Sequence, residues 1–404
     1  MIDEPSTRQF LLLSPLAIIG AALLLSQLLG VLLHQRGWPK LYGAVLAGLL
    51  LGNSGLGAVD APLLSQFQEL FNAASALVLF EVGRRMDLAW LWRSRRQGAA
   101  LLGGCLLRGA ASFAVAAAAG VAPAQAALIG AIAIAVNPVV FASMTSDSNA
   151  SGVVTYAGAN ALGISNLLAL LALSMALAWI RGHSSASELT VLGELGRQAG
   201  TLALGTAIAL LCYGLYALAT RLARAPAAVR PGILLAALLM DLGLCSVSSA
   251  SALLSLLLMG LLLRNAEDRD NVFQAQVKTG QDIGYALLFM MSAALVDVQQ
   301  MLHGYAVLIA ALLFAVRLLA MRAGLALGSA WSGPKKNALA LSLCSLVGVG
   351  SLVVDNSLAK TAGLDGLGAQ VMAALLALNV LLGPGLTWLG LRMAGETYEG
   401  DDHG

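Results

Sequence analysis

Two arginines lie inside long apolar stretches of the sequence, Arg108 in Leu-Leu-Arg-Gly-Ala and Arg317 in Ala-Val-Arg-Leu-Leu. A buried guanidinium is costly unless negative charge or carbonyl oxygens surround it, so such residues are typically retained for a function. We predict that Arg317 belongs to a binding site, because the nearby Arg322 is better placed to act as a surface anchor. For Arg108, a site role and a packing role against helix carbonyls both stay open.

Two further stretches combine helix-breaking residues with the same apolar setting. Ala-Val-Asn137-Pro138 places a proline, which removes a backbone hydrogen bond, in the middle of an apolar run. Leu-Val-Gly348-Val-Gly350-Ser supplies two glycines at a similar depth of another run. Interruptions at corresponding positions of two halves of a chain are a pointer to a transporter's binding site. We predict that Asn137, Gly348 and Gly350 contribute to such a site; the alternative is a proline kink and glycine packing without function.

The elements that position these residues are membrane-spanning helices. The chain has 404 residues, of which 59% are hydrophobic and 11% charged, whereas soluble domains average about 45–50% apolar and about 25% charged residues. So much apolar surface cannot be buried in water behind so few charges. The composition excludes a soluble enzyme, a nucleic-acid binder and a disordered scaffold, and indicates a polytopic membrane protein.

The apolar runs are continuous and lack alternation, which favours helices over strands and predicts an all-α membrane protein forming a single membrane domain, 1–404. A span needs roughly 20 apolar residues. By that length the sequence predicts about thirteen spans: 11–33, 41–58, 69–84, 98–120, 124–145, 152–180, 199–220, 232–246, 248–263, 281–297, 303–321, 337–356 and 367–392. The acidic tail 395–404 is expected to be disordered.

The distribution of Lys and Arg predicts how the chain is oriented. Of the 23 such residues, seventeen fall in loops on one side, four on the other, and Arg108 and Arg317 remain inside spans. Because cytoplasmic loops carry the excess of positive charge, the N-terminus is expected outside and the C-terminus in the cytoplasm. The expected location is the plasma membrane, in bacteria the inner membrane.

Four stretches, in their order and spacing, resemble the monovalent cation:proton antiporter superfamily, which includes sodium/proton exchangers and glutathione-gated potassium efflux antiporters. They are 37–52, 79–87, Asp241 with Gly-Leu-Cys-Ser and then Met259-Gly260, and 289–297. The resemblance implies an inverted-repeat fold with two crossed broken helices. It implies a core subdomain at approximately 69–180 and 281–356, and a scaffold or dimerisation subdomain at approximately 11–58, 199–263 and 367–392. It also implies a homodimer, with an accessory or regulatory subunit as a further partner besides the lipid bilayer.

The sixth helix departs from the superfamily pattern. Members bind the ion and the proton through an aspartate there, whereas the corresponding stretch reads Gly-Ile-Ser165-Asn166-Leu-Leu, and 155–179 contains no Asp or Glu. The amide oxygen of Asn166 can coordinate a cation but cannot titrate, and Ser165 is equally neutral. Asp241 is the best remaining titratable group for a proton-linked role, although the resemblance places an acid there outside the ion site.

Three functions stay open. The leading one is exchange of Na⁺ or K⁺ for protons by alternating access. The same fold could instead carry an anion or a polar organic solute bound near Arg317, or the chain could be a non-transporting subunit or sensor. A membrane enzyme is the weakest reading because no catalytic motif, cofactor motif or metal-ligand spacing stands out, and we expect no cofactor, bound metal or nucleic-acid partner.

Overall fold

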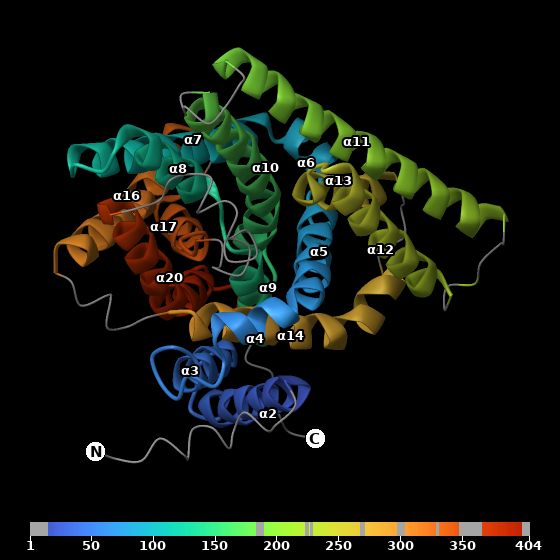
Figure 1. Ribbon diagram of the computed structural model, residues 1–404, viewed down its shortest axis with the longest axis horizontal. Helices are drawn as coiled ribbons and strands as arrows, with labels where there is room; N and C mark the ends of the chain where they lie inside the picture. The colour runs from blue at the N-terminus through green and yellow to red at the C-terminus, as the bar shows by residue number, and fades with distance from the viewer. Residues whose placement is uncertain are drawn as a thin grey trace.

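The computed structural model describes residues 15–182, 190–222, 226, 229–266, 271–296, 304–328, 331–346 and 366–397. These residues form α-helices joined by turns and short irregular segments, with no strand in the described ranges, so the predicted all-α class is confirmed (Figure 1). The helices are α2 (Pro15–His34), α3 (Leu41–Leu51), α4 (Ala61–Gln66), α5 (Gln68–Arg84), α6 (Leu88–Arg93), α7 (Arg95–Ala118), α8 (Pro123–Ile134), α9 (Pro138–Asp147), α10 (Val153–Gly182), α11 (Val191–Leu222), α12 (Arg230–Ser248), α13 (Ala252–Ala266), α14 (Asn271–Ala294), α16 (Gly304–Leu327), α17 (Gly333–Ser342) and α20 (Gly366–Met393).

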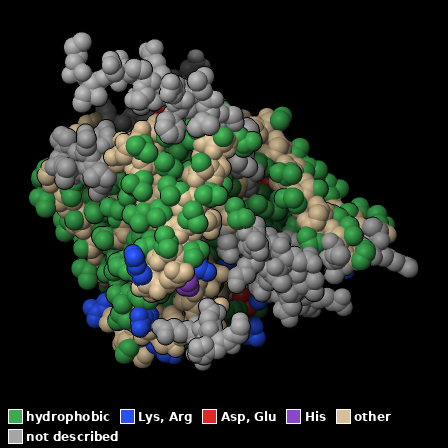
Figure 2. Space-filling view, turned by 90° about the horizontal axis from the view of Figure 1, so that it is seen from below, with side chains coloured by type: hydrophobic (Ala, Val, Ile, Leu, Met, Phe, Trp, Pro, Cys, Tyr) green, Lys and Arg blue, Asp and Glu red, His purple; other side chains and the backbone are tan. Residues whose placement is uncertain are grey.

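Each of the thirteen predicted ranges overlaps a described helix. In the described part of the chain, eight segments are long and apolar enough to span a membrane, with α8 and α9 counted together. Shorter apolar helices are Leu41–Leu51, Ala252–Ala266 and Ile283–Ala294, so the exact number of spans stays a prediction. Figure 2 shows a broad hydrophobic surface with Lys and Arg gathered towards one edge, which we call the basic face.

The predicted interruption in the fifth span is confirmed as a break between α8 and α9. Ala135 and Asn137 have extended backbone angles, and Pro138 is the first residue of α9. The Asn137 side chain accepts hydrogen bonds from the backbone nitrogens of Val139 at 3.0 Å and Val140 at 3.4 Å. Asn137 therefore caps α9, and proline occupies a position where its missing N–H costs nothing.

Only the N-terminal side of the predicted interruption in the twelfth span lies within the described residues. The helix α17 ends at Ser342, and residues 343–346 continue without helical structure. Gly348 and Gly350, predicted as site residues, lie outside the described residues.

Helix contacts divide the bundle into two groups with α11 contacting both (Figure 1). The crossing group comprises α7, α8, α9, α10, α16, α17 and α20, and the flanking group comprises α2, α3, α5, α12, α13 and α14. Three helices pack differently from the predicted subdomains: α20 packs on α16 and α17, α5 on α13, and α14 on α3. The predicted bounds came from the family resemblance, whereas these groups follow the contacts between helices. That these groups act as a moving core and a scaffold stays a prediction.

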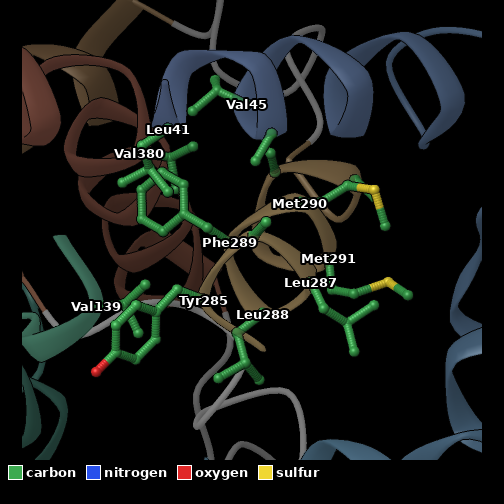
Figure 3. Close-up of a cluster of buried hydrophobic side chains, with 14 of the residues drawn as sticks. Leu41, Val45, Val139, Tyr285, Leu287, Leu288, Phe289, Met290, Met291 and Val380 are labelled. Carbon is green, nitrogen blue, oxygen red and sulfur yellow. The ribbon is translucent and has the colours of Figure 1, made fainter. Parts of the chain in front are cut away.

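An apolar cluster fills the boundary between the two groups (Figure 3). It joins Leu41 and Val45 of α3, Phe289 of α14, Val139 of α9 and Val380 of α20. We call it the interface cluster. Apolar contacts have no fixed direction, so this surface holds the groups together without fixing their register.

The α5–α13 contact depends on close backbone approach. A Cβ at Gly260 would overlap the carbonyl oxygen of Phe80 and come within 2.8 Å of the backbone nitrogen of Arg84. Gly243 in α12 has open space where its Cβ would lie, with no atom within 4 Å. A comparison of alanine substitutions at Gly260 and Gly243 therefore distinguishes the effect on helix packing from the general effect of alanine in a helix.

Gly260→Ala is predicted to destabilise the protein by about 1–3 kcal/mol, because the added methyl group forces α5 and α13 apart. Gly243→Ala, the matched control, should be neutral or stabilising by up to about 1 kcal/mol. Thermal unfolding of both variants in detergent checks this. An unfolding temperature of Gly260→Ala equal to that of the unmodified protein would show that the contact is not tight.

Candidate functional site

Two helix ends face each other inside the crossing group. The helix α8 ends at Ile134 and α17 ends at Ser342, and the unwound segments that follow them touch where the Asn137 backbone nitrogen donates to the Ser345 carbonyl oxygen at 3.0 Å. The last four carbonyls of any helix lack intrahelical partners, and each such end carries about half a negative charge. Two such ends buried together require hydrogen-bond donors and positive charge.

Arg108, on α7, supplies both. Its Nη1 donates to the Leu343 carbonyl oxygen at 3.0 Å, and its Nη2 donates to the Ile134 carbonyl oxygen. The side chain is 1% exposed. Its Nε has no hydrogen-bond partner among the described residues. One guanidinium thus bridges the end of α8 and the end of α17, which gives Arg108 a definite role at the crossing.

Arg317, on α16, bridges the same two ends from another direction. Its Nε donates to the Ala133 carbonyl at 3.1 Å, its Nη2 to the Ala135 carbonyl at 3.2 Å and its Nη1 to the Cys344 carbonyl at 3.0 Å. The side chain is 1% exposed. The planar, forked guanidinium suits several carbonyls at once, which a lysine ammonium could not satisfy in the same geometry.

Asn379 completes the crossing, and the sequence argument missed it. Its Oδ1 accepts from the Leu346 backbone nitrogen at 2.8 Å and from Arg317 Nη1 at 3.4 Å, while its Nδ2 donates to the Leu375 carbonyl at 2.7 Å. Asn379 is 4% exposed. The available signal was an amide in an otherwise apolar stretch, Ala-Leu-Asn379-Val-Leu, in the last span.

Asn166 and Ser165 approach the crossing from α10. The Asn166 Nδ2 donates to the Val136 carbonyl at 3.0 Å and to the Leu162 carbonyl at 2.9 Å, and the residue is 6% exposed. Its Oδ1 accepts no hydrogen bond from a described residue. Ser165 is fully buried, and its hydroxyl donates to the Leu162 carbonyl at 3.0 Å. Both N–H groups of the amide are therefore engaged, whereas its oxygen has no donor within the part of the chain that the structure describes.

The structure thus brings together several of the predicted site residues: Asn137, Ser165, Asn166 and Arg317. Asp241 lies elsewhere, on α12, which packs on α11, α13 and α5. It is fully buried, with Oδ2 accepting from Ser255 Oγ at 2.8 Å and Oδ1 from Cys245 Sγ at 3.6 Å. Asp241 is therefore not a neighbour of the residues at the crossing.

Unwound helices that are buried in protein at the middle of an apolar bundle define the class of the molecule. Such backbone is tolerated in a membrane only where protein or a water-filled cavity surrounds it, and it is the hallmark of secondary transporters. A family model described as sodium/hydrogen exchanger, transmembrane, matches residues 19–389. The chain therefore belongs to the sodium/hydrogen exchanger family, a family of cation:proton antiporters, which confirms the predicted superfamily.

Comparison with solved structures supports the same fold. The chain is similar to the sodium proton antiporter MjNhaP1 from Methanocaldococcus jannaschii, solved at pH 8, with a TM-score of 0.66 and 20% sequence identity. The match covers 94% of this chain and 95% of that chain. No curated protein sequence matches the chain. At this identity the likeness establishes the antiporter fold, and the chemistry of the site has to come from this chain's own residues.

Arg317→Met is predicted to destabilise the protein by roughly 3 kcal/mol or more, because the buried carbonyls of both helix ends lose their donor. Arg317→Lys should be intermediate, since one ammonium keeps the charge but not the fork. Thermal unfolding in detergent measures both.

The control for this comparison is Arg322→Met. Arg322 lies on the same helix but is exposed, and its Nε donates to Asn337 Oδ1 at 2.7 Å. Its loss should change stability by less than about 1 kcal/mol. Equal stability of Arg317→Met and Arg322→Met would contradict the bridging role.

Proposed function

We propose that the chain exchanges a monovalent cation, Na⁺ or K⁺, for protons by alternating access, with Asn166 as a cation ligand. The family match supports antiport in general. The observation that carries the choice of cargo is the orientation of the Asn166 amide: carbonyls hold its Nδ2, and no described residue donates to its Oδ1. Oxygen ligands suit Na⁺ and K⁺, and Ser165 offers a second oxygen on the adjacent residue.

The hydrogen bonds of Arg317 argue against an anion or a polar organic solute as cargo. Anion sites present several converging N–H donors. Arg317 donates four hydrogen bonds, to three backbone carbonyls and to Asn379, out of the five that a guanidinium can make. Its charge is opposed by the two helix ends that it caps. The crossing is therefore better suited to a cation held by oxygens than to an anion held by Arg317.

Coupling requires a group that carries the proton, and we propose Asp241. The described chain has four buried acids. Three have arginine partners or N–H donors at a helix start: Glu81 (Arg84 and Arg85), Glu194 (Arg197) and Glu396 (Val154 and Thr155). Asp241 has only a hydroxyl and a thiol as partners in the described part of the chain, so a charged form is poorly stabilised there.

We further propose that the protein is a homodimer of the bacterial inner membrane, with the basic face in the cytoplasm. The support is the excess of Lys and Arg in the loops on one side, which is typical of cytoplasmic loops. The N-terminus then lies outside and the C-terminus inside. An accessory or regulatory subunit stays a prediction.

Sealed proteoliposomes with an internal pH dye test the exchange. Addition of Na⁺ or K⁺ should move protons through the unmodified protein, and Asn166→Leu should lower the initial rate about tenfold or more, because the cation loses an oxygen ligand. Asn337→Ala, which changes a half-buried asparagine of α17 that bonds the exposed Arg322, is the control and should keep the rate. Absence of proton movement with both cations, for folded and correctly inserted protein, would reject the proposed exchange.

Asp241→Asn tests the proton-linked role separately. The amide keeps the shape and the hydrogen bond with Ser255 but cannot titrate. Cation-driven proton movement should fall by about tenfold or more, while binding of ²²Na⁺ or ⁸⁶Rb⁺ to purified protein should persist and lose its dependence on pH. An unchanged pH dependence of binding in Asp241→Asn would exclude Asp241 as the proton carrier.

A further inference from the structure

A side chain of the flanking group is inserted into the backbone of a crossing-group helix. The Tyr42 hydroxyl, on α3, donates to the Leu381 carbonyl of α20 at 3.0 Å, and it accepts from the Gly385 backbone nitrogen at 2.9 Å. In an α-helix the N–H of Gly385 would donate to the carbonyl of Leu381, four residues earlier. The hydroxyl therefore bridges the two partners of one helical hydrogen bond.

The sequence of α20 permits this insertion. Pro384 lies inside the helix and has no N–H, so the ladder is already interrupted one residue before Gly385. Side chains that insert into the ladder are a recognised cause of helix kinks. A Cβ at position 385 would come within 2.6 Å of the Tyr42 hydroxyl oxygen, so any larger residue there would displace the hydroxyl. Pro384 and Gly385 together allow the Tyr42 hydroxyl to insert into the backbone of α20.

The inserted hydroxyl lies where the two groups meet. Leu41, the residue before Tyr42, and Val380, the residue before Leu381, both belong to the interface cluster, whose close-up is Figure 3. The Lys40 backbone nitrogen donates to Asp147 Oδ2 of α9 at 3.0 Å. The start of α3 thus holds both α9 and α20 by polar contacts within an otherwise apolar boundary.

The contact also lies close to the crossing along α20. Asn379, two residues before Leu381, accepts from Arg317 and from the Leu346 backbone nitrogen. A change in the backbone around Leu381 is therefore one helical turn or less from the residues that hold the broken helices. The chain of contacts runs from Tyr42 through α20 to the crossing.

We propose that Tyr42 is a positioning residue that latches the flanking group to the crossing group, and that its hydroxyl leaves α20 when the two groups move past each other. This inference rests on the proposed alternating access. When the hydroxyl withdraws, Gly385 can donate directly to Leu381, so the backbone is satisfied in both states. Two satisfied arrangements of the same element make a two-state switch.

Hydrogen–deuterium exchange of the full chain in lipid nanodiscs tests the latch without any transport assay. Tyr42→Phe keeps the ring and removes the hydroxyl. We expect exchange to become about fivefold to tenfold faster at Gly385, because its N–H loses the hydroxyl while the retained ring keeps it from the Leu381 carbonyl. Exchange should become faster by a similar factor at Lys40, whose amide bonds Asp147, because the latch holds both contacts. The control is Tyr305→Phe, which removes a hydroxyl bond at 3.3 Å to the Ala119 carbonyl within the crossing group and should leave both sites unchanged.

Two outcomes would overturn the proposal. Faster exchange confined to Gly385 would mean that Tyr42 only fills a kink, and unchanged exchange at both sites would mean that the hydroxyl holds nothing. Gly385→Ala, which displaces the hydroxyl by its methyl group, should reproduce the effect of Tyr42→Phe at Lys40. Failure to do so in a folded variant counts against the latch.

Transport kinetics supply a second arm. In proteoliposomes Tyr42→Phe should raise the maximal rate about threefold to tenfold and leave the KM for the cation unchanged, because the residue acts on movement rather than on binding. A change in KM with an unchanged maximal rate would contradict the proposal. Inactivity of the unmodified protein would reject the proposed exchange, and the hydrogen-exchange result would still decide whether the latch exists.

Discussion

The structure depends on two helix ends that meet in a low-dielectric interior. The carbonyls at the end of α8 and at the end of α17 both need donors, and their partial negative charges repel each other. Arg108 and Arg317 resolve both problems, since each guanidinium bonds carbonyls from the two ends. The arginines in turn are tolerated there because the carbonyls surround them. The broken helices would be unstable without the two arginines, and the buried arginines would be unstable without the helix-end carbonyls.

This arrangement constrains what the crossing can bind. Both arginines donate to backbone carbonyls, and Asn166 directs its N–H groups to carbonyls, so the Asn166 amide oxygen is an acceptor without a donor among the described residues. In the proposed function, Asn166 binds the cation and Asp241 carries the proton, two roles that a single carboxylate would combine. Asp241, the buried acid that we propose as the proton carrier, belongs to the flanking group. Coupling of proton binding to cation binding would therefore require communication between the two groups.

Local features were predictable from the sequence, whereas long-range contacts were not. Proline after Asn137 predicted the break between α8 and α9, and the apolar setting of Arg317 predicted its burial. The partners of both arginines are backbone carbonyls, which no side-chain pattern records, so Arg108 could not be assigned. The assignment of α5, α14 and α20 to groups depends on contacts between distant segments, and the insertion of Tyr42 into α20 joins residues more than 300 positions apart.

The most direct test is an experimental density map of the protein in lipid nanodiscs at a resolution that shows side chains. The account predicts that the Arg108 and Arg317 guanidiniums lie between the ends of α8 and α17, each contacting carbonyls from both, with Asn166 beside Val136. An acidic side chain paired with either guanidinium at this junction, or Arg317 directed towards lipid, would contradict it.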